Sequence, residues 1–302
     1  MLCAYNLRNG NERNIHLPDL IYKNQNITEI LCDILGMNEI LQLLYVVSGF
    51  KPGARIIVAE KYYNIIYSFL SALGMFVLRS DFYVINKVIR NAGYSYRKSP
   101  VPQGEKSKIF IYLAFDKEYC AALKNYEAES NDYEFGKLLG YPTCCVKHFS
   151  RCIYSKPGDY FMNSVTQHST FLYYPFLNNT ALWAFGIGIL DHFPCKQDCR
   201  QSSKLARRYT EMLKRVNHHY YEFLERELKA IVICLRNASV VYSNNYSKTR
   251  HGLVLNEIKG DGRDPLYCLI KKHGILPLTN PNKFDIGKKQ FVWPEAKIIV
   301  FN

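Results

Sequence analysis

Two groups of cysteines, each led by a proline, constrain this chain more than any other feature. The first lies in LGYPTCCVKHF, residues 139–149, and the second in HFPCKQDC, residues 192–199. The N-terminal stretch has no apolar run behind a basic start, so we expect no signal peptide and a cytoplasmic protein. Cysteines in that compartment stay reduced unless they bind metal or take part in chemistry. We therefore expect the fold to bring the two groups together.

The first group should lie at the start of a helix. Pro142 suits a first helical turn, which needs no proline N–H, and Cys144 and Cys145 would follow it in that turn. Free N–H groups and the positive end of the helix favour thiolate there. His148 is four residues after Cys144 and Cys152 is seven after Cys145, so each adjacent cysteine has a neighbour on its own helical face.

The second group supplies a pair at i and i+4. Cys195 and Cys199 would lie on one helical face or in one tight turn, with His192 just upstream. Adjacent residues on a helix point about 100° apart, so we expect only one of Cys144 and Cys145 to join them around a metal. A fourth position would then stay open for His192, the second adjacent cysteine, Cys152 or a substrate. An open position is typical of a catalytic metal site.

These patterns assign candidate roles to individual side chains. We predict Cys144, Cys145, Cys195 and Cys199 as the metal ligands, and the last three as the cofactor contacts. Cys195 and Cys199 should be obligatory, whereas one of Cys144 and Cys145 should be replaceable. Cys144, His148 and His192 are the candidate catalytic residues. The remaining cysteines stand alone in apolar or helical contexts, where a free thiol packs as a small hydrophobic side chain: Cys3, Cys32, Cys120, Cys234 and Cys268.

The two groups also resemble a known family. The segments EFGKLLGYPTCCVKHF and HFPCKQDCRQSSKLA are similar to the pattern F-G-x-L-L-G-Y-P-x-C-C-x-x-F followed by H-x-P-C-x-x-x-C-x-x-S. That pattern belongs to the prokaryotic family called domain of unknown function 483. The resemblance covers roughly residues 105–215. It implies that the two cysteine groups form one site, and it implies no particular activity.

The charge is unevenly distributed, and because the basic residues are scattered, a surface that keeps the protein soluble is the slightly favoured interpretation over an anionic partner. Residues 201–302 carry 18 basic and 9 acidic side chains, whereas residues 101–200 carry 10 of each. A basic surface can meet nucleic acid, an anionic substrate or an acidic partner, and it can also serve solubility alone. The basic residues nearest the second cysteine group are Lys204, Arg207, Arg208, Lys214 and Arg215.

Three functions from different classes fit these observations. We favour an iron–sulfur enzyme of the 4Fe-4S type that acts on a small or sulfur-bearing substrate at an open position. The first alternative is a zinc-stabilised module that binds RNA or another anion. The second is a metal-free redox enzyme that cycles an adjacent thiol pair through a disulfide. We expect no membrane partner, since the apolar stretch ILQLLYVVSGF is too short to span a bilayer.

Hydrophobic periodicity predicts an α/β fold, with α+β as the alternative. Residues 51–86 read as a strand, a helix closed by Gly74 and a second strand, which indicates one β-α-β unit of a parallel sheet. A cysteine-rich helical middle follows, and one long amphipathic helix should run from Leu205 to Ile231. Apolar segments in the basic tail predict a small antiparallel sheet. We divide the chain into residues 1–100, 101–236 and 237–302.

Overall fold

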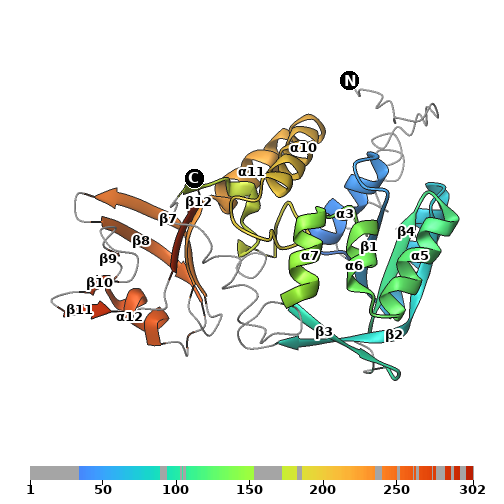
Figure 1. The fold of residues 1–302 in the computed structure, drawn as a ribbon, viewed down its shortest axis with the longest axis horizontal. Coiled ribbons are helices and arrows are strands. Elements are labelled where there is room, and N and C mark those ends of the chain that lie inside the picture. The colour runs from blue at the N-terminus through green and yellow to red at the C-terminus, as the bar shows by residue number, and fades with distance from the viewer. Residues whose placement is uncertain are drawn as a thin grey trace. The chain divides into compact units, whose positions relative to one another are not determined.

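The protein divides into two compact units, which the computed structural model describes over most of their length. The first unit comprises residues 1–87 and 96–141, and the second residues 88–95 and 142–302. The structure describes residues 34–88, 94–102, 104, 107–152, 172–181, 186–234, 240–249, 252–260, 262, 265–273, 275–276, 283–286, 289–292 and 297–301. Helices and sheets alternate along the chain, so the predicted mixed α and β class is confirmed (Figure 1). No helix within these ranges combines the length and apolarity needed to cross a bilayer.

A four-stranded sheet organises the N-terminal half of the chain. Its strands lie in the order β1-β4-β2-β3, and β4 pairs antiparallel with both β1 and β2. The elements in chain order are α3 (Met37–Val47), β1 (Gly53–Ala59), the 3-10 turn η1 (Glu60–Tyr62), α4 (Tyr63–Ala72), β2 (Phe76–Val88), β3 (Tyr94–Ser99), β4 (Lys108–Ala114), α5 (Lys117–Ala128) and α6 (Asp132–Leu138).

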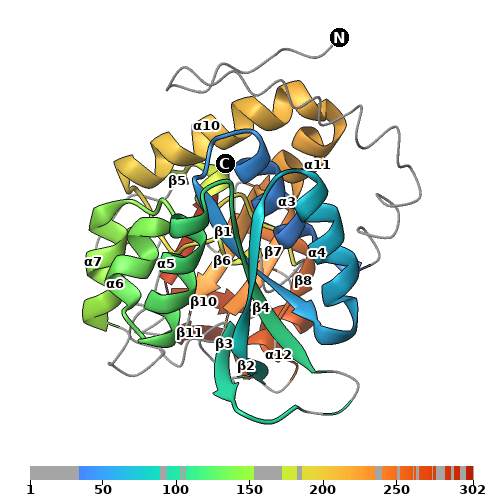
Figure 2. The same cartoon turned by 90° about the vertical axis from the view of Figure 1, so that its right-hand side faces the viewer.

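Strand β4 is buried on both faces because helices cover the sheet on each side. Alternate residues of a strand point to opposite faces. Ile109, Ile111 and Leu113 pack in one apolar cluster with side chains of α3 and α4. The intervening residues Phe110, Tyr112 and Ala114 pack in a second cluster with side chains of α5 and α6. Figure 2 shows the two helix pairs on either side of β1 and β4.

The predicted parallel β-α-β unit at residues 51–86 is not confirmed. Its strands and its helix are present as β1, α4 and β2, and Gly74 closes the helix with a positive φ of 76°. The strands β1 and β2 run in the same direction, but β4 lies between them and pairs antiparallel with each. Apolar periodicity identifies strands but not their neighbours, and β4 comes from later in the chain.

A six-stranded sheet organises the C-terminal part of the second unit. Its strand order is β5-β12-β6-β7-β8-β9, antiparallel except for the short parallel pairing of β5 with β12. The antiparallel tail predicted from the sequence is therefore confirmed. The second unit's elements are α7 (Thr143–Cys152), β5 (Leu172–Tyr173), η3 (Pro175–Leu177), α10 (Arg200–Val216), α11 (His218–Leu228), β6 (Ala230–Cys234), β7 (Val240–Thr249), β8 (Gly252–Lys259), α12 (Pro265–His273), β9 (Ile275–Leu276), β10 (Lys283–Ile286), β11 (Lys289–Val292) and β12 (Lys297–Phe301).

The prediction of a single helix from Leu205 to Ile231 is wrong, because the helix is interrupted at Asn217. The backbone of Asn217 is extended, with φ −152° and ψ 91°, and separates α10 from α11. The Asn217 side chain accepts a hydrogen bond of 2.9 Å from the Tyr220 backbone N–H and so caps α11. Ile231 lies in β6. The apolar side chains continue at helical spacing through Asn217, so the periodicity alone did not indicate that this residue caps a new helix.

Buried hydrogen bonds hold the end of α11 in place. The Tyr242 hydroxyl, on β7, donates to the Glu227 carbonyl over 2.6 Å. Asn178 lies just after η3, and its side-chain amide donates to the Leu228 carbonyl over 2.8 Å. The rings of Phe176 and Tyr221 stack with centroids 5.6 Å apart. These contacts fix α11, which follows directly after α10, and α10 begins at the second cysteine group.

Candidate metal centre

The first cysteine group lies in the first turn of α7, as the sequence predicts. The Pro142 carbonyl accepts hydrogen bonds from the backbone N–H groups of Cys145 (2.8 Å) and Val146 (3.0 Å), so Pro142 starts the helix without needing an N–H of its own. Cys144 is exposed and Cys145 is buried. Both thiols therefore lie next to the positive end of a ten-residue helix.

The second cysteine group forms a tight turn rather than a helical face. The Cys199 backbone N–H donates to the Lys196 carbonyl over 3.1 Å, which closes the turn. The Cys199 carbonyl accepts from the Ser203 N–H over 2.8 Å, so Cys199 is the N-cap of α10. Of the two arrangements that the i,i+4 spacing allowed, the structure has the turn. It brings Cys199 to the positive end of a second helix.

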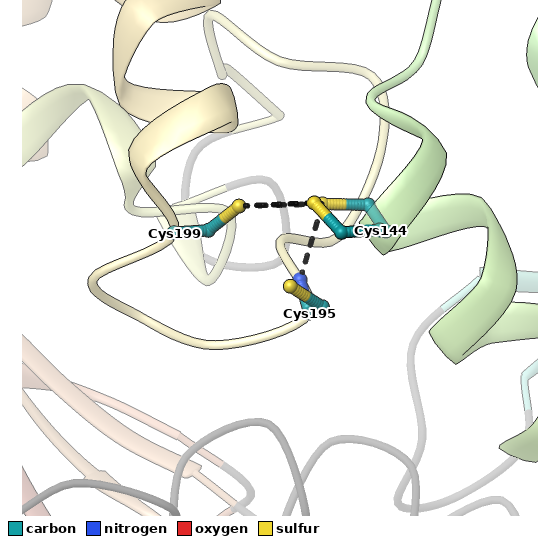
Figure 3. Close-up of side chains that lie close together, drawn as sticks. Cys144, Cys195 and Cys199 are labelled. Carbon is teal, nitrogen blue, oxygen red and sulfur yellow. Dashed lines mark hydrogen bonds between the residues drawn. The ribbon is translucent and has the colours of Figure 1, made fainter.

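The two groups meet in one cluster of four sulfurs, as predicted. The ligand atoms of Cys144, Cys145, Cys195 and Cys199 all lie within 4.8 Å of one another. The sulfur of Cys199 is 3.7 Å from that of Cys144 and 3.6 Å from that of Cys145. Figure 3 shows Cys144 pointing from α7 toward Cys195 and Cys199 on the facing turn.

The expectation that only one of the adjacent cysteines reaches the cluster is not met. The sulfurs of Cys144 and Cys145 are 3.9 Å apart, and both face Cys199. Side chains of an α-helix lean toward its N-terminus. In the first turn they therefore extend past the helix end, where neighbouring residues can converge on one point. The cluster lies at such a point.

The cluster stabilises one thiolate strongly. Hydrogen bonding from the Cys145 thiol, with further hydrogen bonds from the hydroxyl and backbone of Ser202, lowers the pKa of Cys199 to about 4. The same interaction, with burial, raises the pKa of Cys145. Burial raises the pKa of Cys195 to about 12. Without a cation, the four sulfurs would therefore carry a thiolate on Cys199 beside the protonated thiols of Cys145 and Cys195.

A hydrogen-bonded layer lies behind the sulfurs. The Ser202 hydroxyl is 3.2 Å from the Cys145 sulfur and 3.0 Å from His192 Nε2. The His192 carbonyl accepts a hydrogen bond from the Asn179 side chain. The Cys195 backbone N–H donates to the Cys145 sulfur over 3.3 Å. Such outer contacts fix the direction of a thiol and tune its affinity for a metal.

The comparison with known families decides what this segment is. Residues 103–229 match the model of a family described as "Protein of unknown function (DUF483)". We refer to this matched segment as the DUF483 region. All four clustered cysteines lie within it, and so do α7 and α10. No curated protein and no solved structure matches the chain significantly.

The predicted histidines of the DUF483 region do not join the cluster of sulfurs. Among the described residues, the group able to surround one ion consists of the four cysteines alone. His192 is buried and contacts the cluster through Ser202. His148 lies on α7, where burial and the nearby Arg151 lower its pKa. The side chain of Cys152 lies outside the described residues. Catalytic roles for Cys144, His148 and His192 stay predictions.

In the sequence analysis Ser202 appears only as a position of the DUF483 pattern, and no role was predicted for it. The signal that points to it is its position three residues after Cys199, inside the first turn of the helix that Cys199 caps. From there a short side chain reaches back over the helix end. No sequence signal points to Asn179, because only the fold brings it close to His192, whose carbonyl it contacts.

Cysteines outside the cluster occupy separate places. Cys120 and Cys234 are buried and Cys268 is exposed, whereas Cys3 and Cys32 lie outside the described residues. The Cys120 thiol donates toward the carbonyls of Phe76 and Tyr112, and burial raises its pKa to about 11. A neutral thiol held in this way packs as an apolar side chain. Among the described residues, the four clustered cysteines are thus the group that could bind a metal.

Proposed function

We propose that Cys144, Cys145, Cys195 and Cys199 bind a single tetrahedral metal ion, with zinc as the favoured metal. The separation of the sulfurs is the observation that carries this proposal. Zinc–sulfur bonds of about 2.3 Å in tetrahedral geometry set the four sulfurs about 3.8 Å apart. The three distances that involve Cys144, Cys145 and Cys199 are 3.6, 3.7 and 3.9 Å. One ion fits these three separations, and the Cys195 sulfur lies within 4.8 Å of the other three.

A four-iron cluster fits the same cysteines poorly. Each iron of such a cluster takes one cysteine, so its ligand sulfurs lie roughly 6 Å apart or more. All four sulfurs here lie within 4.8 Å of one another. We therefore prefer the zinc alternative to the iron–sulfur enzyme favoured from the sequence. The sequence patterns suit both metals, and the short separations of the sulfurs support zinc.

Four thiolate ligands point to a structural role for the metal. A closed tetrahedral set leaves no position for a substrate, unlike the open set of a catalytic zinc site. The ion would link the start of α7 to the start of α10. These helices are separated by the 47 residues between Cys152 and Arg200. Two helix N-termini next to the ion would favour the thiolates that it needs.

The metal-free redox reading makes a different use of the same contacts. The sulfurs of Cys145 and Cys199 are 3.6 Å apart, and the low pKa of Cys199 would make it the thiolate that attacks an external disulfide. The first substrate thiol would leave, and Cys145 would then displace the second as a Cys145–Cys199 disulfide forms. Cys144 is exposed, and this alternative predicts that its thiol is oxidised reversibly. This alternative requires that the four cysteines carry no metal in the cell.

Cobalt substitution separates these functions. Tetrahedral Co²⁺ held by four thiolates gives strong visible ligand-field bands and an intense near-ultraviolet thiolate band. We expect both in the reconstituted protein, with one Co²⁺ per chain and displacement by one Zn²⁺. Spectra of octahedral Co²⁺, or a protein that takes up no Co²⁺, would contradict the proposal. The control is Cys268→Ser, an exposed cysteine outside the cluster, which should keep the full spectrum.

The partner of the protein is a separate question. We propose an anionic partner, on the basis of the excess of 18 basic over 9 acidic residues in residues 201–302. A closed zinc site would then support a binding module rather than an enzyme. Nucleic acid is the partner that the arrangement of charges on α10 supports best.

A further inference from the structure

Helix α10 has one buried face and one charged face. The buried side chains fall along one side of the helix: Ser202, Ala206, Tyr209, Thr210, Met212 and Leu213. The exposed basic side chains lie opposite and define the basic face of α10: Arg200, Lys204, Arg207, Arg208, Lys214 and Arg215. The fold therefore turns the charges outward and commits the apolar side to the interior.

The basic face is narrow and long. A helix turns about 100° per residue, so the six basic residues fall within an arc of about 120°. From Arg200 to Arg215 the helix rises about 22 Å at about 1.5 Å per residue. Glu211 is the acidic residue in this arc. The arc contains no apolar residue, whereas a helix that lies in a membrane surface needs apolar residues to insert.

Most of this charge is not neutralised within the unit. Among the described residues, no ion pair engages Arg200, Lys204, Arg207 or Lys214. Two of these side chains rest on aromatic rings. The Arg207 guanidinium lies 4.5 Å from the centroid of Tyr174, and the Lys214 ammonium lies 4.4 Å from the centroid of Tyr221. These contacts hold the cations in place at the surface and leave their charge intact.

We propose that the basic face of α10 binds the phosphate backbone of single-stranded RNA. One stacked strand carries one negative charge per about 3.4 Å, so about six phosphates lie along the 22 Å of the helix. Six basic residues match that number. A duplex of the same length carries about 13 charges on two strands, and a 120° arc faces only one of them. This inference rests on the anionic partner proposed above and not on the identity of the metal.

The salt dependence of binding tests the proposal directly. The full chain is titrated against a fluorescent 20-nucleotide single-stranded RNA of mixed sequence, at salt concentrations from about 50 mM upward. Release of counterions from four to six phosphates gives a slope of log Kobs against log salt of about −3 to −4, at about −0.7 per phosphate. Each variant is used only after its metal content matches that of the unmodified protein, so that failure of the metal proposal is recognised separately.

Two matched double variants assign the binding to α10. The double variant Lys204→Gln with Arg207→Gln should make the slope of log Kobs against log salt shallower by about 1.4. If the variant and the unmodified protein bind equally at 1 M salt, the variant should then bind about 25-fold more weakly at 0.1 M salt. The control is Lys61→Gln with Lys117→Gln, which removes the same charge from exposed residues of the first unit and should leave the slope unchanged. A third variant, Glu211→Gln, should bind RNA more tightly, because it removes the negative charge from the basic face.

Several results would overturn the proposal. One is the absence of RNA binding at about 50 mM salt, where an electrostatic interaction is strongest. Another is an equal loss in the control double variant, or no gain from Glu211→Gln. Tighter binding to the duplex of the same sequence, or to vesicles of anionic lipid, would assign the face to a different partner and equally refute the single-stranded RNA assignment.

Discussion

Replacing Ser202 with alanine isolates the layer behind the metal. A metal-bound thiolate can only accept hydrogen bonds, so the Ser202 hydroxyl donates to Cys145 over 3.2 Å. The Ser202 oxygen then accepts from His192 Nε2–H over 3.0 Å. Ser202 is fully buried, and its replacement by Ala removes both contacts without adding volume. The change therefore alters the support of one ligand and leaves all four ligands in place.

The expected loss follows from these two contacts. A hydrogen bond to a charged group contributes about 1.5–3 kcal/mol. Loss of a residue that supports a metal ligand costs about 10- to 100-fold in metal affinity, which is about 1.4–2.7 kcal/mol. We therefore expect Ser202→Ala to weaken zinc binding about 30-fold, near the middle of that range. His192→Ala should have a smaller effect, since it contacts the sulfur only through Ser202.

Competition with a chromophoric zinc chelator measures this affinity. The control is Ser203→Ala, the adjacent serine of α10, whose side chain is half-buried and makes no contact with the sulfurs among those described. The Co²⁺ spectrum should shift in Ser202→Ala, because the thiolate of Cys145 loses a donor, and should not shift in Ser203→Ala. Equal zinc affinities for the two variants would refute the role given to Ser202.

Three further predictions address the cluster and the core. The double variant Cys195→Ser with Cys199→Ser should lose all bound metal and unfold at lower temperature, whereas Cys268→Ser should change neither metal content nor melting temperature. Zinc binding at neutral pH should release at least two protons, which calorimetry in buffers of different ionisation enthalpy measures. Burial and hydrogen bonding raise the pKa values of Cys145 and Cys195, so both thiols are protonated without metal. Cys199 is already a thiolate. Zinc affinity should accordingly rise with pH, and release of clearly fewer than two protons would contradict the assignment of charges. Ile111→Ala should lower the free energy of unfolding by about 2–5 kcal/mol in denaturant titrations, since Ile111 is fully buried in the central strand β4.

The sequence predicted the meeting of the two cysteine groups but not its geometry. A proline before each group indicated a helix start or a turn, and α7 and the turn before α10 are where these signals predict them. The distance between sulfurs depends on how two helix ends face each other, which local spacing does not determine. The adjacent pair Cys144 and Cys145 shows this most clearly. An angle of about 100° argues against convergence in mid-helix, but it does not apply past the helix end.

The sheets show the same division between local and long-range information. Apolar periodicity located β1 and β2 correctly, because each strand carries its own pattern of buried residues. It could not show that β4 lies between β1 and β2, since that choice depends on which later segment returns to the sheet. Asn217 is the opposite case. Its capping signal was present in the sequence, and the apolar stripe on either side of it outweighed the signal in our prediction.

The metal and sulfide content of anaerobically purified protein tests the central claim most directly. The account predicts one zinc ion per chain, no acid-labile sulfide and a colourless protein, because four sulfurs within 4.8 Å of one another surround a single ion. Chelation of that ion should lower the melting temperature of the protein. About four iron and four sulfide ions per chain in a brown protein would contradict the account and restore the iron–sulfur enzyme.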